Sequence, residues 1–226
     1  MTKESEIIWE ELESDIVTRK YLPGCKLAET EIAGKYHLSR TPIRDIFKAL
    51  EQDGLLEVRS QSGSFVTPIN LRDRDDRRFI RASIELQILT SVRGKRTASD
   101  FLYLDADLEK RKHRSFEKGK GDKLTFANSY FDLDNHFHAF LYDKAKKSSV
   151  LEWLNTKHPT FRRYRFLTFL RDDPELESFY LNHKAIYDVL KDNDRSKLQD
   201  VVVKHNYSGR IGLDKVKKER PELFVR

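Results

Sequence analysis

The sequence has little of what disulfide bonds and membrane spans require. It contains one cysteine, Cys25, in 226 residues. A single thiol excludes an internal disulfide framework and a metal site built from several thiolates. No apolar run approaches the roughly 18 residues that cross a bilayer, and no signal-peptide core follows the charged start MTKESE. These absences predict a cytoplasmic protein that does not act at a membrane.

The composition is that of a folded protein with a basic bias. Hydrophobic residues make up 38% and charged residues 35%, and no tract rich in Ser, Gly or Pro is present. This length suits two ordinary domains or one large one, each with a packed core. The formal net charge of +6 is compatible with a polyanionic partner, but many proteins that bind no polyanion share it.

The first third of the chain has the pattern of three helices followed by a hairpin. Helical spacing of apolar residues predicts helices over residues 4–19, 29–36 and 39–52. Pro23-Gly24 and Asp53-Gly54 end the first and third of these. Extended runs over 55–59 and 64–68, joined by SQSG, predict a hairpin. This order is typical of a winged helix-turn-helix.

The rest of the chain is predicted to be helical. Residues 71–77, in the charged segment NLRDRDDRR, are expected to form a linker. We expect helices at about 78–94, 99–117, 122–145, 149–170, 174–192 and 194–217. The predicted fold is therefore mainly α, with a winged helix-turn-helix domain over 1–70 and an all-helical bundle over 78–226.

The third predicted helix has one apolar face and one basic face. Its apolar face carries Ile43, Ile46, Phe47 and Leu50, and its polar face carries Arg40, Thr41, Arg44 and Lys48. Arginines four residues apart can both enter a DNA major groove and bind guanines or phosphates. The alternative for this helix alone is an ordinary amphipathic surface helix, but the three-helix and hairpin context favours DNA binding.

The motifs in this segment resemble those of the GntR family of bacterial regulators. They are LPG-x-KL-x-E-x-E-I-A, S-R-T-P-I-R, L-x-x-D-G-L-L and G-S-F-V, within about residues 10–68. The resemblance implies that Arg40, Thr41 and Arg44 contact DNA and that Gly63 lets the wing tip approach the minor groove. Two residues depart from the family pattern, Thr30 in place of a frequent arginine and Ser62 before the tip glycine.

The C-terminal half places metal-type ligands on apolar helix faces. Asp134 and His138 are four residues apart on one face, and His183 and His205 lie on the apolar stripes of two later helices. A buried carboxylate needs a proton, a cation or a metal. One Asp and three His suit a divalent metal, Zn first, with Ni, Mn or Fe as alternatives. Any one of these histidines alone is more often a hydrogen-bonded core residue.

This half resembles the FCD effector domain of the FadR-like branch of the family. FDLDNHFH is similar to its D-x-x-F-H motif, and His183 and His205 fall at its other two ligand positions. The resemblance implies a helical bundle whose metal helps to bind a small organic acid. Arg81 and Glu85 match its R-x-x-L-E signature. Arg81 is then a candidate clamp for the effector's carboxylate, or else a salt-bridge partner of Glu85.

Together these features predict a transcription regulator, foremost a repressor, that binds double-stranded DNA at a pseudo-palindromic operator as a homodimer. A small carboxylate bound at the metal site would control DNA binding. The alternatives are a metal-dependent enzyme with an attached DNA-binding module and a dimeric DNA-binding protein without an effector. No H-E-x-x-H pairing is present, and an enzyme would leave the N-terminal motif unexplained, so we expect no enzymatic activity.

Overall fold

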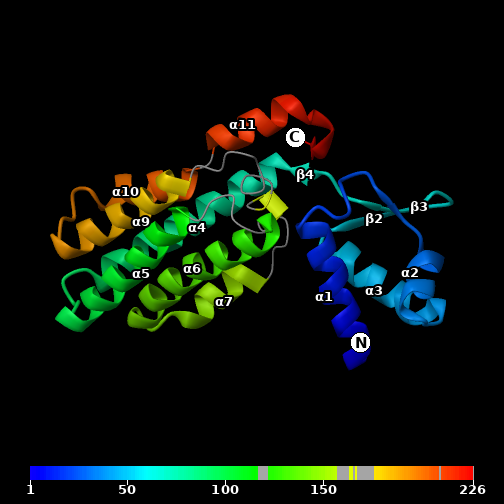
Figure 1. Cartoon of the computed structure of the whole chain (residues 1–226), viewed down its shortest axis with the longest axis horizontal. Coiled ribbons are helices and arrows are strands. Elements are labelled where there is room, and N and C mark those ends of the chain that lie inside the picture. Colours follow the sequence, from blue (N-terminus) through cyan, green and yellow to red (C-terminus); the bar gives the residue numbers. More distant parts are fainter. Residues whose placement is uncertain (117–121, 157–162, 165, 167–175, 209, 226) are drawn as a thin grey trace. The chain divides into compact units, whose positions relative to one another are not determined.

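The computed structural model describes residues 1–116, 122–156, 163–164, 166, 176–208 and 210–225 (Figure 1). Contacts between residues divide the chain into two compact units. The first unit comprises Met1–Arg74, Lys157–Leu167 and Lys215–Arg226, and the second comprises Asp75–Thr156 and Thr168–Asp214.

The N-terminal part of the first unit contains three helices and a small antiparallel sheet, which confirms the predicted fold class. Its main elements are α1 (Lys3–Val17), β1 (Lys26–Leu27), α2 (Glu29–Tyr36), α3 (Arg40–Gln52), β2 (Leu56–Arg59) and β3 (Gly63–Val66). The sheet order is β1-β3-β2. Leu27 pairs with Ser64, and Leu56 pairs with Val66. The two-residue strand β1 has no sequence signature and was not predicted.

The turn after α3 directs the chain into the hairpin. Gly54 adopts a left-handed conformation with φ of +71°, which a glycine adopts without the steric cost of a Cβ. Its backbone N–H donates to the carbonyl of Glu51 at 2.9 Å, and Leu55 N–H donates to the carbonyl of Leu50 at 2.8 Å. Leu50 and Leu55 are fully buried in the core formed by the helices and the sheet. The helix end therefore fixes the start of β2.

The first unit also includes a second, parallel pair of strands. β4 (Ile69–Asn70) pairs with β5 (Phe224–Val225), which follows α11 (Arg210–Glu219) and the 3-10 turn η1 (Pro221–Leu223). Ile69 is buried against Val216 and Leu223. Such a pairing between distant two-residue segments cannot be read from a local pattern. The extreme C-terminal segment thus belongs to the same compact unit as the predicted DNA-binding region.

The second unit is a helical bundle (Figure 1). Its helices are α4 (Leu71–Val92), α5 (Ala98–Phe116), α6 (Lys123–Lys144), α7 (Ser148–Thr156), α9 (Leu176–Lys191) and α10 (Leu198–Tyr207). Helix α5 packs on both α6 and α9, and α9 packs on α10. The shared core includes the fully buried side chains of Leu89, Leu104, Phe137 and Ile186. Among the described helices, none is both long and apolar enough to span a membrane.

Two predicted element boundaries differ from the structure. Residues 71–77, expected as a linker, form the first turns of α4, because Asn70 Oδ1 accepts hydrogen bonds from the N–H groups of Arg72 and Asp73. The helix predicted over 194–217 is two helices, and Ser208 ends the first with extended backbone. The part of the predicted 149–170 helix beyond Thr156 lies mostly outside the described residues. The division into domains at 70 and 78 stays a prediction.

Candidate functional site

Helix α3 has the two predicted faces. Ile43, Ile46, Phe47 and Leu50 are buried, while the side chains of Arg40, Arg44 and Lys48 are 61%, 56% and 64% exposed. Thr41 is also exposed. Glu29, on α2, holds its Oε2 at 3.5 Å from the Nη2 atoms of both Arg40 and Arg44. The structure therefore presents the predicted basic residues on one accessible face, with a carboxylate between two of them.

The three-stranded sheet adds basic residues that the sequence did not single out. Gly63 has φ of +106°, and a Cβ at this position would lie 2.7 Å from Lys26 Cε. Lys26 Nζ lies 5.9 Å from the ring centroid of Phe65, and the Arg59 guanidinium carbon lies 4.7 Å from it. Glycine at 63 thus makes room for a lysine beside the hairpin strands. Lys26 and Arg59 could be placed next to Gly63 only once the strand register was known.

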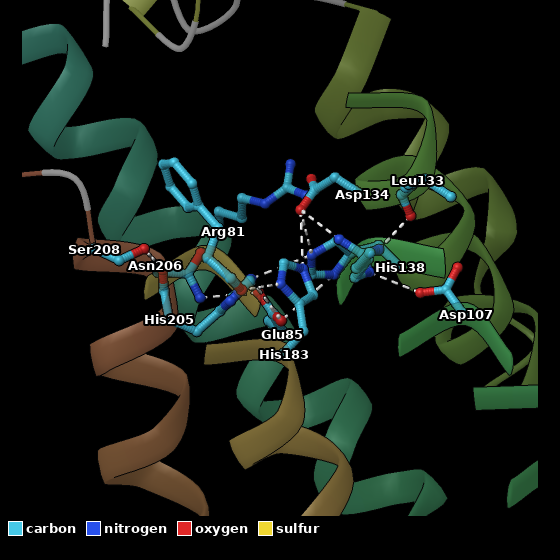
Figure 2. Close-up of polar contacts among 12 residues, drawn as sticks. Arg81, Glu85, Asp107, Leu133, Asp134, His138, His183, His205, Asn206 and Ser208 are labelled. Carbon is cyan, nitrogen blue, oxygen red and sulfur yellow. Dashed lines mark hydrogen bonds and ion pairs between the residues drawn. The ribbon is translucent and has the colours of Figure 1, made fainter. Parts of the chain in front are cut away.

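The three predicted histidine ligands lie together in the second unit, although they come from three helices. His138 is on α6, His183 on α9 and His205 on α10, and one ring nitrogen from each lies within 4.8 Å of the others. The Nε2 atoms of His138 and His205 are 3.2 Å apart. Figure 2 shows the imidazoles converging with Asp134. The histidines that the sequence places on apolar helix faces therefore lie together in the structure.

Asp134 points into this cluster. Its Oδ1 lies 2.9 Å from His183 Nε2 and 3.8 Å from His138 Nε2. Arg111 Nη1 is 3.9 Å from the same oxygen. The fully buried Arg111 is held by Asp107, whose Oδ2 accepts from Nε at 2.7 Å, and by the carbonyl of Leu133. Sequence reasoning missed Arg111, because only the packing of α5 on α6 brings it to Asp134.

The imidazoles are neutral near pH 7. The side chains of His138, His183 and His205 are 1%, 2% and 10% exposed. Burial lowers the pKa of all three below the ordinary value of 6.5, and lowers that of His205 to about 4. The charge of Asp134 raises the pKa of His138 and His183 but does not outweigh burial. Neutral imidazole is the form that binds metals.

The hydrogen bond of His183 leaves one nitrogen lone pair facing a carboxylate. His183 Nδ1 lies 2.7 Å from the carbonyl oxygen of Phe179, which can only accept, so a neutral His183 carries its proton on Nδ1. Its Nε2 then presents a lone pair to Asp134 Oδ1 at 2.9 Å. Among the described residues, this Nε2 has no hydrogen-bond partner. Two facing lone pairs fit a cation between them, so the donor set suits a divalent metal.

Two further polar side chains of α4 lie beside the cluster. Glu85 is 1% exposed, and its Oε1 lies 3.5 Å from His138 Nδ1 and 3.7 Å from His205 Nε2. Asn206 donates from Nδ2 to Glu85 Oε2 at 2.8 Å. Arg81 is buried, donates to Asn155 Oδ1 at 3.4 Å and extends toward Asp134 in Figure 2. The predicted effector residue thus lies at the same site as the predicted metal ligands.

Comparison with protein families assigns both halves of the chain. The family described as bacterial regulatory proteins, gntR family, matches residues 4–66, and the FCD domain matches residues 77–207. The FCD match alone covers more than half of the chain. The chain therefore belongs to the GntR family of bacterial regulators, in the branch that carries an FCD domain. It is a DNA-binding transcription regulator and not an enzyme.

Curated relatives and solved structures agree with this assignment. The HTH-type transcriptional repressor RspR of Escherichia coli K12 is 25% identical, over 96% of this chain and 92% of its own. The galactonate operon transcriptional repressor of the same strain is 24% identical, over 81% of this chain and 85% of its own. The structure of E. coli McbR/YncC has a TM-score of 0.66 at 18% identity, covering 95% of this chain and 99% of that one. The last likeness concerns the fold alone.

Proposed function

We propose that this chain is a repressor whose affinity for its operator is controlled by a small carboxylate bound at a divalent metal ion in the second unit. The observation that carries the metal site is the approach of Asp134 Oδ1 to His183 Nε2 at 2.9 Å while Phe179 occupies His183 Nδ1. A divalent cation held by these residues would replace the repulsion between the two atoms with coordination.

The proposed metal ligands are Asp134, His138, His183 and His205. One carboxylate and three imidazoles form a borderline donor set, for which Zn is the first choice and Ni, Mn and Fe are alternatives. When bound, the metal supplies a Lewis-acid position that a carboxylate can occupy. The protein residues hold the ion from three helices, so that effector binding can bias the packing of α6, α9 and α10.

Arg81 is proposed to bind the effector's carboxylate. Its guanidinium has the planar fork that suits a carboxylate, and the buried side chain lies on α4 four residues before Glu85. The name of one relative refers to a galactonate operon, that is, to a sugar acid. A hydroxy or sugar acid is therefore the effector class that we expect.

The DNA-binding surface is proposed to consist of Arg40, Thr41, Arg44, Lys48 and Gly63. The first four lie on the exposed face of α3 and Gly63 lies in the hairpin. Two copies of this surface in a homodimer would bind the half-sites of a pseudo-palindromic operator. Two of the relatives above are named as repressors, which supports repression over activation.

The experiment that tests this function combines metal analysis with operator binding. The protein is purified without chelator and loaded with Zn, Ni or Mn, and its operator is selected from randomised duplexes. We expect one equivalent of metal, and a change in operator affinity of about tenfold or more on adding glycolate, lactate, gluconate or galactonate. His183→Ala should bind the operator normally and ignore every acid. Substoichiometric metal in each preparation would contradict the metal site.

A further inference from the structure

Two of the three imidazoles, those of His183 and His138, differ in what contacts the nitrogen that faces away from the cluster. For His183 that nitrogen is Nδ1, and the carbonyl of Phe179 accepts a hydrogen bond from its N–H. His138 directs Nε2 toward both Asp134 and His205, so Nδ1 is its outward nitrogen. Among the described residues, His138 Nδ1 has no hydrogen-bond partner within standard geometry.

Glu85 Oε1 lies 3.5 Å from His138 Nδ1. This oxygen is likewise without a hydrogen-bond partner in the described part of the chain, and both side chains are 1% exposed. A buried donor and a buried acceptor that both lack a partner cost free energy unless they meet. A shift of a few tenths of an ångström would join them.

The other carboxylate oxygen of Glu85 is already fixed. Asn206 Nδ2 donates to Glu85 Oε2 at 2.8 Å and to the carbonyl of Val202 at 3.0 Å. Asn206 follows His205 directly on α10, and its side-chain amide is thus anchored to the backbone of the same helix. This anchor leaves Oε1 as the oxygen of Glu85 that is available to the imidazoles.

We propose that Glu85 is a positioning residue of the metal site. Its carboxylate accepts a hydrogen bond from the Nδ1–H of His138 and so leaves the His138 Nε2 lone pair to face the metal. Metal-binding histidines commonly donate their other N–H to a carboxylate, which fixes the tautomer and the ring orientation. The inference rests on the proposed metal site. It gives Glu85 a role apart from the salt bridge with Arg81 that its spacing suggests.

The test compares Glu85→Ala, Glu85→Asp and Glu85→Gln with the unmutated full chain. Zn affinity is measured by competition with a chromophoric chelator, and the imidazole tautomers of the metal-free protein are read from long-range ¹H–¹⁵N NMR spectra. We expect His138 to carry its proton on Nδ1 in the unmutated protein. Glu85→Ala should weaken Zn binding about 10- to 100-fold and mix the His138 tautomers, while Glu85→Asp or Glu85→Gln restores part of both.

A matched control is Asp100→Asn. Asp100 is another buried carboxylate of the second unit, but its ion-pair partner is Lys144 at 2.6 Å. This variant should lose stability without changing Zn affinity or the His138 tautomer. If Glu85→Ala does not fold, the isosteric Glu85→Gln variant provides both measurements.

The outcomes separate this inference from the proposed function. A His138 proton on Nε2 in the unmutated protein overturns the inference, as does Zn binding by Glu85→Ala within about twofold of normal. Loss of Zn by Glu85→Gln as complete as in His138→Ala would make Glu85 a ligand and also overturn it. If the unmutated protein binds no metal, the metal site fails, but the tautomer measurement still decides whether Glu85 orients His138.

Discussion

The Nε2 atoms of His138 and His205 lie 3.2 Å apart, although the residues are 67 positions apart in the chain. Burial lowers the pKa of both rings, so neither is a cation near pH 7. Their lone pairs can be bridged by one proton or by a metal, and a metal would tie α6 to α10.

Metal removal should therefore lower the thermal stability of the protein. Zn at about 100 times its dissociation constant adds about 2.7 kcal/mol to the native state, which corresponds to a rise in Tm on the order of 5–10 °C for a protein of this size. Differential scanning calorimetry of chelator-treated protein with and without Zn measures this. His183→Ala should show no rise, and an unchanged Tm in the unmutated protein would refute the prediction.

Replacing Arg40 or Arg44 by Ala should weaken operator binding. Each is more than half exposed on α3, and loss of a bidentate contact to a base costs about 1–3 kcal/mol. Fluorescence anisotropy with a labelled operator measures the change. Lys110→Ala, which removes an exposed positive charge from α5 in the second unit, serves as the control. Normal affinity in both arginine variants would reject this assignment.

Glu29 should oppose DNA binding. Its Oε2 lies 3.5 Å from Arg40 Nη2 and Arg44 Nη2, and DNA must compete for both guanidinium groups. Exposed ion pairs contribute about 0.2–1 kcal/mol, so Glu29→Gln should tighten binding to random-sequence DNA by up to about fivefold. A gel-shift titration with calf thymus competitor measures it, and a weaker complex would mean that Glu29 instead orients the arginines for binding.

The stability of the second unit should fall in acid because of Asp100. The hydrogen bond from Lys144 and then that from the Thr97 backbone lower the pKa of Asp100 to about 2 from its usual 3.8. A depressed carboxyl pKa stabilises the native state above pH 3.8, and this contribution is lost as the pH falls toward 2. Urea unfolding at pH 5 and pH 3 should show a smaller loss for Asp100→Asn than for the unmutated chain. Equal losses would argue against this ion pair.

A fragment of residues 1–74 should fold and bind DNA weakly. The core around Leu12, Ile43 and Leu50 is complete within it, whereas Ile69 loses Val216 and Leu223, a loss of roughly 1.5–3 kcal/mol if the side chain becomes exposed. Circular dichroism and anisotropy test both statements. A fragment that neither folds nor binds would contradict a boundary near residue 70.

Short-range sequence patterns predicted the helix ends and the buried helix faces, because these depend on residues that are close together in the chain. The apolar periodicity of α3 and the Asp53-Gly54 stop were sufficient for its length and faces, and the apolar stripes of α6, α9 and α10 identified the histidines that point inward. Long-range packing was not predictable in this way. Arg111 and Glu85 reach the cluster only through the packing of one helix on another, and β4 meets β5 across 155 positions of chain between Ile69 and Phe224.

One buried arginine illustrates the same limit. The sequence places Arg162, Arg163 and Arg165 in a basic cluster that could line the effector pocket or coat a helix, and the surface is the expectation for most of them. Arg163 is instead 2% exposed and donates to Thr67 Oγ1 at 3.0 Å and to the Thr67 carbonyl at 2.6 Å. Burial lowers its pKa to about 10. The charge of Arg163 therefore did not reveal that its side chain is buried in the first unit. Arg162 and Arg165 lie outside the described residues.

The near-complete burial of His138 and His183 bears on how quickly a bound ion could leave. The imidazoles of these two residues are shielded from water unless the surrounding helices open, and such local opening in a packed core is rare. The side chains of Asp134 and His205, by contrast, are 13% and 10% exposed, and they leave a side from which an acid could reach the ion. A metal held there would exchange slowly, over many cycles of DNA binding and release. The regulator would then carry its ion as a lasting structural component and respond to the passing organic acid rather than to the concentration of free metal.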